Sequence, residues 1–225
     1  GEELVGYSYY VAEEQKGLIG DLFVLEEYRT AENEQRLMAA VLEALMRTRR
    51  VRRVESQLML FRSARQGVLP GAQYLRAYER NFMVLDLERV GELRPKALWS
   101  MVLFDRWTER RQEETAQLIA AAYQGHIDSQ INDQYRSVAG ARRFLFNIVQ
   151  YPGCGTFFQP ASWVAIERAS GRLCGACLSS LVARDVGHIT QVCVAPAVKG
   201  TGVGYELMRR ALESLAGSGA RKVSL

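Results

Sequence analysis

The sequence predicts an α/β fold that is built twice, each time as a sheet flanked by helices. Three observations lead to this prediction. The chain has 225 residues, of which 48% are apolar, which is enough for one large core or two small ones. A pattern of about forty positions occurs once near the start of the chain and again near its end. Each copy combines short apolar runs, typical of strands, with one segment of helical period.

The repeat has a nearly constant offset of 170 residues. The aligned apolar pairs are Ile19 and Ile189, Val24 and Val194, Leu37 and Leu207, and Met38 and Met208. Upstream of these pairs Gly6 aligns with Gly175 at an offset of 169, so the alignment needs a gap of one residue in the hairpin. Self-similarity of this kind indicates two units of one architecture.

The first copy predicts two strands, a short turn, a third apolar strand and then an amphipathic helix. Apolar residues with a spacing near 3.6 define the buried face of that helix: Leu37, Met38, Val41, Leu42, Leu45 and Met46. Beyond it we expect a strand over 52–60, a helix over 71–80 and a strand over 82–87. The interruption of the pattern around Gly91 and Pro95 places a domain boundary within 87–97.

The second copy follows the same order, with more chain in front of it. We expect a strand over 97–107, helices within 108–125 and 135–150, and a hairpin across 162–182. An apolar strand over 188–194 leads to a helix with the face Met208, Ala211, Leu212 and Leu215, and a last strand starts near 220. The expected domains are 1–90 and 97–225. Both copies are incomplete, because each lacks elements that the other has. We favour an excerpt of a longer chain over two halves that complete each other.

Composition excludes several classes of protein. The net charge of +4 is modest, and the basic run 47–53 follows a helix end, where it suits the helix dipole, so we expect no nucleic-acid partner. We expect a soluble cytoplasmic protein with no membrane partner, because no window is apolar enough to span a membrane and the N-terminus is no signal peptide. The four cysteines, Cys154, Cys174, Cys177 and Cys193, do not form a disulfide framework. Since Cys174 and Cys177 should point to opposite faces of a strand, no metal site is expected.

The clearest candidate for a ligand-binding segment is "VAPAVKGTGVG", residues 194–204, between the apolar strand and the helix. A glycine-rich turn that opens a helix suits an anion, because the first N–H groups lack partners and the dipole is positive there. A plain strand-to-helix turn could use the same glycines. A Walker loop is excluded, since Gly-Tyr-Glu stands where Gly-Lys-Ser/Thr is needed. The G-x-G-x-G spacing and the basic start of the next strand also fit a dinucleotide fingerprint poorly.

What the stretch resembles is the acyl-coenzyme A signature of the GCN5-related N-acetyltransferase (GNAT) superfamily. That signature is a strand ending V-x-P, then Arg/Gln-x-x-Gly-x-Gly/Ala at the start of a helix; here it reads Val194-Ala195-Pro196 and Lys199 to Gly204. Lysine at 199 is a departure that keeps the positive charge. The resemblance covers 97–225 and implies a mixed, mostly antiparallel twisted sheet flanked by helices, in tandem. It also implies acetyl-CoA as co-substrate, bound by Val192, Cys193, Val194, Lys199, Gly200, Thr201, Gly202, Val203, Gly204 and Tyr205.

The resemblance implies an N-acetyltransferase in which a substrate amine attacks the thioester directly. We take His188 as the candidate general base, since an ordinary imidazole titrates near neutrality. By alternation His188 should share a face with Thr190 and Val192. Cys193 is interpreted as a packing residue, and the group that protonates the thiolate is expected beyond Leu225. The acceptor is a small amine or a peptide amine, and a homodimer stays open. The alternative is a non-catalytic acyl-CoA-binding or scaffold protein.

The first copy has lost the signature. By the same alignment Glu32 and Glu34 replace Gly202 and Gly204, and Thr30 replaces Gly200. Carboxylates at a site built for anions add repulsion, so we expect this copy to be degenerate and to bind no coenzyme A. In the first copy the equivalent strand and helix are connected without any glycine. A purely structural need for the three glycines of the second copy is therefore improbable.

Overall fold

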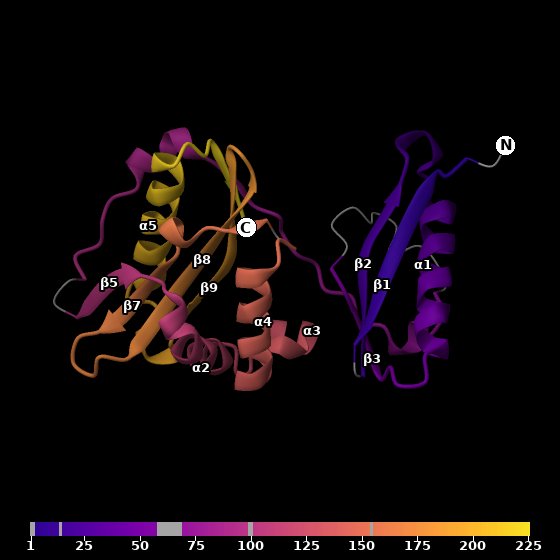
Figure 1. Ribbon diagram of the computed structural model, residues 1–225, viewed down its shortest axis with the longest axis horizontal. Helices are drawn as coiled ribbons and strands as arrows, with labels where there is room; N and C mark the ends of the chain where they lie inside the picture. Colours follow the sequence, from indigo (N-terminus) through magenta and orange to yellow (C-terminus); the bar gives the residue numbers. More distant parts are fainter. Residues whose placement is uncertain (1–2, 14, 58–68, 99–100, 154) are drawn as a thin grey trace. The chain divides into compact units, whose positions relative to one another are not determined.

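The computed structural model describes residues 3–13, 15–57, 69–98, 101–153 and 155–225. Two compact units make up the chain, the N-terminal unit Gly1–Tyr78 and the C-terminal unit Glu79–Leu225. Both have α and β structure with mixed sheets flanked by helices, as the sequence predicts (Figure 1). Each unit is described by itself below.

The N-terminal unit is a three-stranded sheet with one helix on it. Strands β1 (Gly6–Glu13) and β2 (Lys16–Val24) form an antiparallel hairpin, and β3 (Arg53–Ser56) pairs with β2 in parallel. Helix α1 (Ala31–Arg47) packs on one face of this sheet (Figure 1). Its buried residues meet those of β2 in one core cluster: Ile19, Leu22, Val24, Met38, Val41, Leu42, Leu45 and Leu69.

The C-terminal unit has a seven-stranded sheet with the order β4-β10-β9-β8-β7-β5, and β6 pairs with β8. Its strands are β4 (Val84–Asp86), β5 (Val102–Arg106), β6 (Thr156–Phe157), β7 (Trp163–Glu167), β8 (Leu173–Ala183), β9 (Val186–Val194) and β10 (Lys222–Ser224). Its helices are α2 (Gln112–Ala122), the short α3 (Asp128–Ile131), α4 (Val138–Gln150) and α5 (Val203–Gly217). One core cluster lies under α5, and a second lies between the sheet and the helices α2 and α4 (Figure 1).

The boundary between the units lies earlier than the sequence suggests. Strand β4 pairs with β10, with Leu85 opposite Val223, so residues 79–90 belong to the C-terminal unit. The helix expected over 71–80 is wrong: only Ala72–Tyr74 form a 3₁₀ turn, after Gly71 in the left-handed region. Tyr74 is 82% exposed and Leu75 is 49% exposed, so this segment has no buried face that would hold a helix in place.

The segments aligned at an offset of 170 form matching elements. Strand β9 has the bounds of β2 shifted by 170, and the 3₁₀ turns Glu26–Tyr28 and Pro196–Val198 keep the same offset. In the described part of the N-terminal unit one two-stranded hairpin precedes the helix, not the three strands that the sequence suggested, whereas β7, β8 and β9 precede α5 as expected. The slip of one residue falls in β8, where Val182 is the extra residue between the pairs Leu181 with Gly187 and Ala183 with Val186.

Matching glycines bring the helix onto the hairpin in both units. A Cβ atom on Gly17 would lie 2.6 Å from Leu45 Cδ2, and one on Gly187 would lie 2.9 Å from Leu215 Cδ1. Leu45 and Leu215 are fully buried. The two units therefore use the same close approach between strand and helix, because a side chain at either glycine would push the helix away.

A β-bulge at Thr190 changes the alternation of β9. Leu178 pairs with Gln191 and Ser179 pairs with Ile189, so Thr190 has no direct partner. Val192 packs in the cluster under α5, whereas Cys193 belongs to the cluster on the α2 side. The expectation that His188 shares a face with Val192 is therefore wrong, because one extra residue inverts the order of faces.

A second bulge affects the cysteine pair. Ala165 pairs with Gly175 and Ile166 with Leu173, which leaves Cys174 as the extra residue. Cys174 and Cys177 consequently pack in the same core cluster, not on opposite faces as expected. Cys154 lies outside the described residues.

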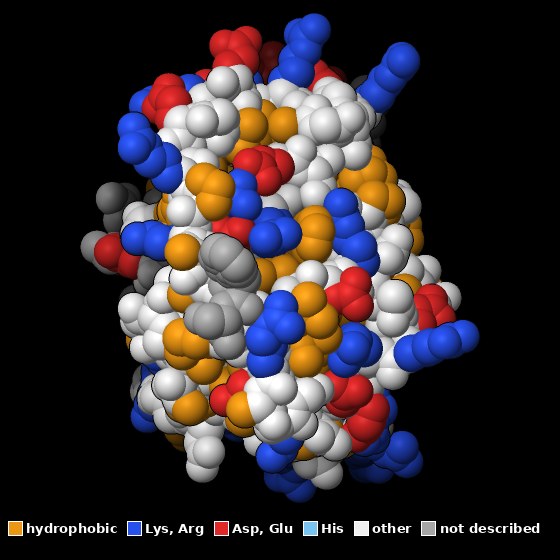
Figure 2. All heavy atoms as spheres, turned by 90° about the vertical axis from the view of Figure 1, so that its left-hand side faces the viewer, with side chains coloured by type: hydrophobic (Ala, Val, Ile, Leu, Met, Phe, Trp, Pro, Cys, Tyr) orange, Lys and Arg blue, Asp and Glu red, His pale blue; other side chains and the backbone are white. Residues whose placement is uncertain are grey.

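Three properties concern the described residues as a whole: membrane-spanning helices, metal-binding clusters and surface charge. Over those residues no helix is both long and apolar enough to cross a membrane. The described ranges contain no cluster of three or more His, Cys, Asp or Glu side chains placed to hold a metal ion. On the face that Figure 2 shows, Lys and Arg side chains are scattered among acidic and hydrophobic ones.

Candidate acyl-CoA site

A cavity of about 220 Å³ lies where the end of β9, the start of α5 and the end of α2 meet. Its lining residues come from these three elements and the loop before α5: Ala122, Tyr123, His126, Val192, Cys193, Val194, Lys199 and Gly204. Five of them are residues that the sequence assigned to cofactor binding. Tyr123 and His126 are residues that the sequence analysis missed.

The glycine loop takes the backbone path that its sequence favours. Gly200 has φ +79° and Gly202 has φ +97°, so both need a residue that tolerates the left-handed region. This corrects the expectation of no structural need at these two positions. Gly204 is different: its φ is ordinary for an L-residue, and a Cβ there would come no closer than 3.6 Å, to Val194. Nothing in the fold requires glycine at 204, and this residue lines the cavity.

The start of α5 is suited to an anion. Gly202 is its N-cap and has no side chain to satisfy the first N–H groups, and the helix is 15 residues long, so its dipole is well developed. Not every N–H of the loop is available, because those of Lys199 and Thr201 donate to Pro196 O and Val198 O at 3.3 and 3.4 Å. The Thr201 hydroxyl also donates to Val198 O, at 2.8 Å.

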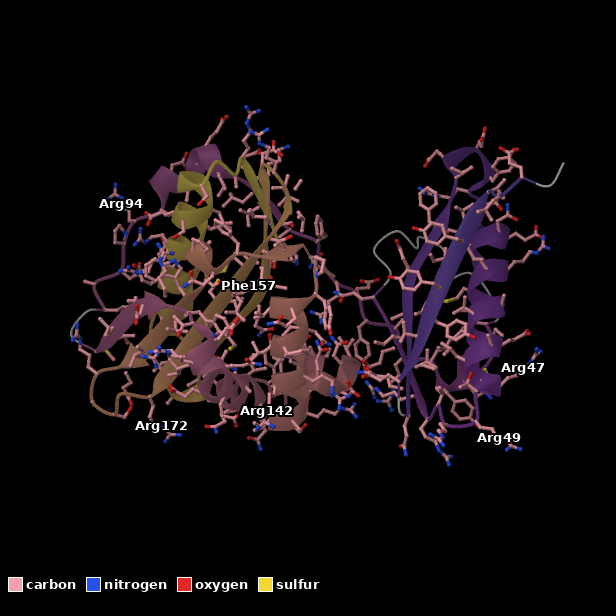
Figure 3. All side chains as sticks on the ribbon, in the orientation of Figure 1. Arg47, Arg49, Arg94, Arg142, Phe157 and Arg172 are labelled. Carbon is pink, nitrogen blue, oxygen red and sulfur yellow. The ribbon has the colours of Figure 1, made fainter. Side chains whose placement is uncertain are left out.

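The other predicted loop residues have structural contacts. Val203 is buried in the core under α5. The Tyr205 hydroxyl donates to Arg94 O at 3.0 Å, and Lys96 Nζ lies 5.9 Å from the centre of the Tyr205 ring. The Arg94 side chain itself points outward from the unit (Figure 3). These contacts hold the segment before β5 against the first turn of α5.

A buried ion pair reinforces this first turn. Glu206 is 1% exposed and Arg209 is 6% exposed. Arg209 donates to both carboxylate oxygens of Glu206, at 2.7 and 2.9 Å, and the Lys96 N–H donates to Oε2 at 3.1 Å. Arg210 Nε donates to Oε1 at 2.9 Å. Burial alone would raise the pKa of Glu206, but these donors and positive charges outweigh it and lower that pKa.

His188 lies outside the residues that line the cavity. Its Nδ1 is 2.9 Å from Ser224 Oγ, and it pairs across the sheet with Ser180. Burial lowers the pKa of His188, although its contact with Ser224 acts in the opposite direction. The ring is therefore neutral at pH 7 and can accept a proton, but the Thr190 bulge puts it on the face opposite Val192.

A polar cluster forms the wall of the cavity on the α2 side. The rings of Tyr123 and Tyr135 are stacked with centroids 4.2 Å apart. The Tyr135 hydroxyl donates to Gln191 Oε1 at 3.3 Å, and Gln191 Nε2 donates to the Tyr123 hydroxyl at 3.0 Å. Burial raises the pKa of Tyr123, and it raises the pKa of Tyr135 to about 12 and that of the Cys193 thiol to about 12. All three groups are protonated at neutral pH, so Cys193 is no nucleophile there.

His126 stands beside this cluster at the cavity. Its ring packs edge-on against Tyr123, and its Nδ1 accepts the N–H of Asp128 at 3.2 Å. Asp128 is buried and forms an ion pair with Arg80 at 2.9 Å. The sequence contains only two histidines, so both His126 and His188 could have been considered as candidates for the site.

The equivalent helix start in the N-terminal unit is filled by its own side chains. Thr30 caps α1 by accepting the N–H of Asn33 at 3.1 Å, and Asn33 Nδ2 donates to Tyr28 O at 2.8 Å. Glu34 is 2% exposed and lies 4.0 Å from the guanidinium of Arg29. Glu32 is exposed. The first turn of α1 is therefore capped by a side chain, whereas the N-cap of α5, Gly202, has none.

A strand, a glycine loop and a helix line a cavity in this α/β unit, an arrangement that suits an anionic, nucleotide-type ligand. Comparison with protein families narrows this class: residues 129–225 match the model of the acetyltransferase (GNAT) family. The comparison with curated proteins gave no significant match.

Solved structures of low sequence identity share the fold. A GCN5-related N-acetyltransferase from Sphaerobacter thermophilus is 15% identical, with a TM-score of 0.63 over 98% of this chain and 67% of that one. A tandem GNAT protein from the clavulanic acid biosynthesis pathway is 17% identical, with a TM-score of 0.62 over 98% of this chain and 69% of its own. Residues 129–225, within the C-terminal unit, are thus similar to the GNAT family of acetyltransferases, and the solved structures show a shared fold.

Proposed function

We propose that this protein is an acetyl-CoA-dependent N-acyltransferase that works in its C-terminal unit, by direct attack of an amine on the thioester in a ternary complex. The observation that carries the proposal is the cavity that joins the glycine loop to the end of β9. Val192, Cys193 and Val194 at the end of β9 line this cavity, so their backbone can bind an extended pantetheine arm.

The site divides into an anionic end and an acyl end. The N–H groups of Gly200 and of 202–205 hold the pyrophosphate, with Lys199 as the neighbouring cation. The backbone of Val192, Cys193 and Val194 binds the pantetheine arm. The thioester then lies near Gln191, at the end of the cavity away from Lys199. Gly204 supports this division, because the fold leaves room for a Cβ there and a closely bound phosphate would favour its absence.

In this proposal the N-terminal unit is a degenerate GNAT copy with a structural role. Its elements match those of the C-terminal unit at one offset, and both use the same glycine-to-leucine contact. Its helix start is occupied by Thr30 and Glu34. The tandem neighbour of similar fold makes such an arrangement reasonable.

Calorimetry with acetyl-CoA, followed by a thiol-release assay with a panel of amines, tests the proposal on the full chain. We expect saturable binding at one site per chain and release of free thiol with at least one small or peptide amine. Binding without thiol release from any amine would favour the alternative of a non-catalytic acyl-CoA-binding protein. Absence of binding would overturn the proposal.

His188 remains the proposed general base, tested by His188→Gln. The variant should lower kcat by about 10²-fold with little change in KM for acetyl-CoA, because the glutamine amide cannot take up the proton. The direction of the pKa shift gives a second readout. Since the pKa of His188 lies below its ordinary value, wild-type activity should persist below pH 6.5 and fall only as the ring becomes protonated. An unchanged pH profile in the variant would assign the base elsewhere.

A further inference from the structure

The polar cluster on the α2 side has a fixed hydrogen-bond direction. The Tyr135 hydroxyl donates to the carbonyl oxygen of the Gln191 side chain, and the Gln191 amide nitrogen donates to the Tyr123 hydroxyl oxygen. A phenol has one hydrogen to donate. Because Tyr123 already accepts from Gln191, its own hydrogen is left for another acceptor. Of the three residues, Tyr123 is the one that lines the cavity.

The cluster is built to hold this direction. Gln191 is 3% exposed and Tyr135 is 9% exposed, and the two tyrosine rings are stacked nearly parallel, 10° apart. The edge of the Tyr135 ring is in turn packed by Phe144 of α4, with centroids 5.5 Å apart. The phenol of Tyr123 is therefore fixed from two sides, by the stacked ring and by the amide. A donor fixed in this way has little rotational freedom left to lose on binding.

The place of this donor coincides with the acyl end of the site. The Thr190 bulge turns Gln191 and Cys193 toward α2, so the Tyr123 hydroxyl lies beside Gln191. Lys199 and Gly204, which line the same cavity, belong to the anionic end of the proposed site. An arm that starts at the loop and follows β9 back from Val194 brings its thioester toward this hydroxyl.

We propose that Tyr123 donates a hydrogen bond to the carbonyl oxygen of the bound acyl thioester, with Gln191 as its positioning residue. This inference rests on the proposed function and names a residue that the family signature does not contain. The hydrogen bond holds the carbonyl in place in the ground state and strengthens as negative charge builds on the oxygen during attack. Burial keeps the phenol protonated, so it serves as a donor and does not transfer its proton.

The test compares the affinities of coenzyme A and acetyl-CoA, which differ in the acyl group, and needs no acceptor. The measured quantity is the ratio of the Kd of coenzyme A to the Kd of acetyl-CoA. In Tyr123→Phe this ratio should fall by about threefold to tenfold relative to wild type, the range of one neutral hydrogen bond, while the affinity for coenzyme A itself stays within about twofold. With carbonyl-¹³C acetyl-CoA, the carbonyl stretch should move to higher frequency in the variant, since it loses a donor.

Tyr135→Phe is the matched control. It removes the hydroxyl that orients the Gln191 amide but keeps the ring stack and Tyr123 itself, so the ratio and the carbonyl frequency should change less than in Tyr123→Phe. Gln191→Glu is a second variant that keeps Tyr123: its carboxylate accepts the phenolic hydrogen, so the ratio should fall as in Tyr123→Phe. A wild-type ratio in Tyr123→Phe, or an equal loss in Tyr135→Phe, overturns the inference. If wild type binds neither coenzyme A nor acetyl-CoA, the proposed function itself has failed.

Discussion

Gly202→Glu/Gly204→Glu should weaken acetyl-CoA binding by about 10³-fold or more. The two carboxylates copy the acidic first turn of α1 into α5 and lie where the proposed site holds the pyrophosphate. Repulsion between close charges costs about 1–4 kcal/mol per pair, and a side chain at the positive φ of residue 202 adds about 1–2 kcal/mol of strain. Calorimetry on the full chain measures the change in Kd.

Two controls separate charge from bulk and from strain. Gly204→Gln has the size of Gly204→Glu without its charge, and residue 204 has an ordinary φ with room for a Cβ, so it should bind more tightly than Gly204→Glu. Gly171→Glu places the same side chain at φ +68° in the turn between β7 and β8, away from the cavity, and should bind like wild type. Wild-type affinity in the double variant would remove the pyrophosphate from this loop.

Glu206→Gln should lower the free energy of unfolding of the C-terminal unit by about 3–5 kcal/mol. Arg209 would then be left buried with only the half-exposed Glu213 as its partner, and an uncompensated buried charge is costly. The tryptophans, Trp99, Trp107 and Trp163, all lie in this unit, so fluorescence during denaturation reports its unfolding alone.

Two control variants of the Glu206→Gln prediction change the other partners of Arg209 or Arg209 itself. Glu213→Gln removes the more exposed partner and should cost less than about 1 kcal/mol. Glu206→Leu/Arg209→Leu removes both buried charges and should recover most of the loss. Because the pKa of Glu206 is lowered in the folded state, its contribution is fully present above about pH 4.3 and disappears as pH falls through the lowered pKa. The difference between wild type and Glu206→Gln should therefore be constant from pH 8 to 5 and shrink in acid; a difference that grew in acid would contradict the assignment.

The sequence predicted those features that depend on local pattern. Apolar spacing located α1 and α5, and the offset of the repeat located β2 and β9, because both signals are carried by neighbouring residues. The glycine loop was found for the same reason, since its chemistry lies in one short stretch of chain.

Features that depend on a single extra residue or on distant packing were missed. The bulge at Thr190 has no signature in "HITQVCV", yet it decides which side chains of β9 face α2 and which face α5. Tyr123 and Tyr135 are far from Gln191 in sequence and meet it only because α2 and the turn after α3 pack against the sheet. The segment 84–86 was assigned to the wrong unit because its partner, β10, lies at the other end of the chain.

The bulge in β9 works as a phase shift. Gly187 and Ile189, before the bulge, face α5. Val192 and Val194, after it, also face α5, so the strand keeps its apolar contact with the helix over its whole length. The same shift occurs in β2, where Gly17 and Ile19 are followed by Leu22 and Val24. Without the added residue, Gln191 would turn under α5 and Val192 toward Tyr123. One inserted residue thus keeps Gln191 and the apolar side chains that support α5 on separate sides of β9, and the same shift in β2 preserves its apolar contact with α1 in a unit without the glycine loop.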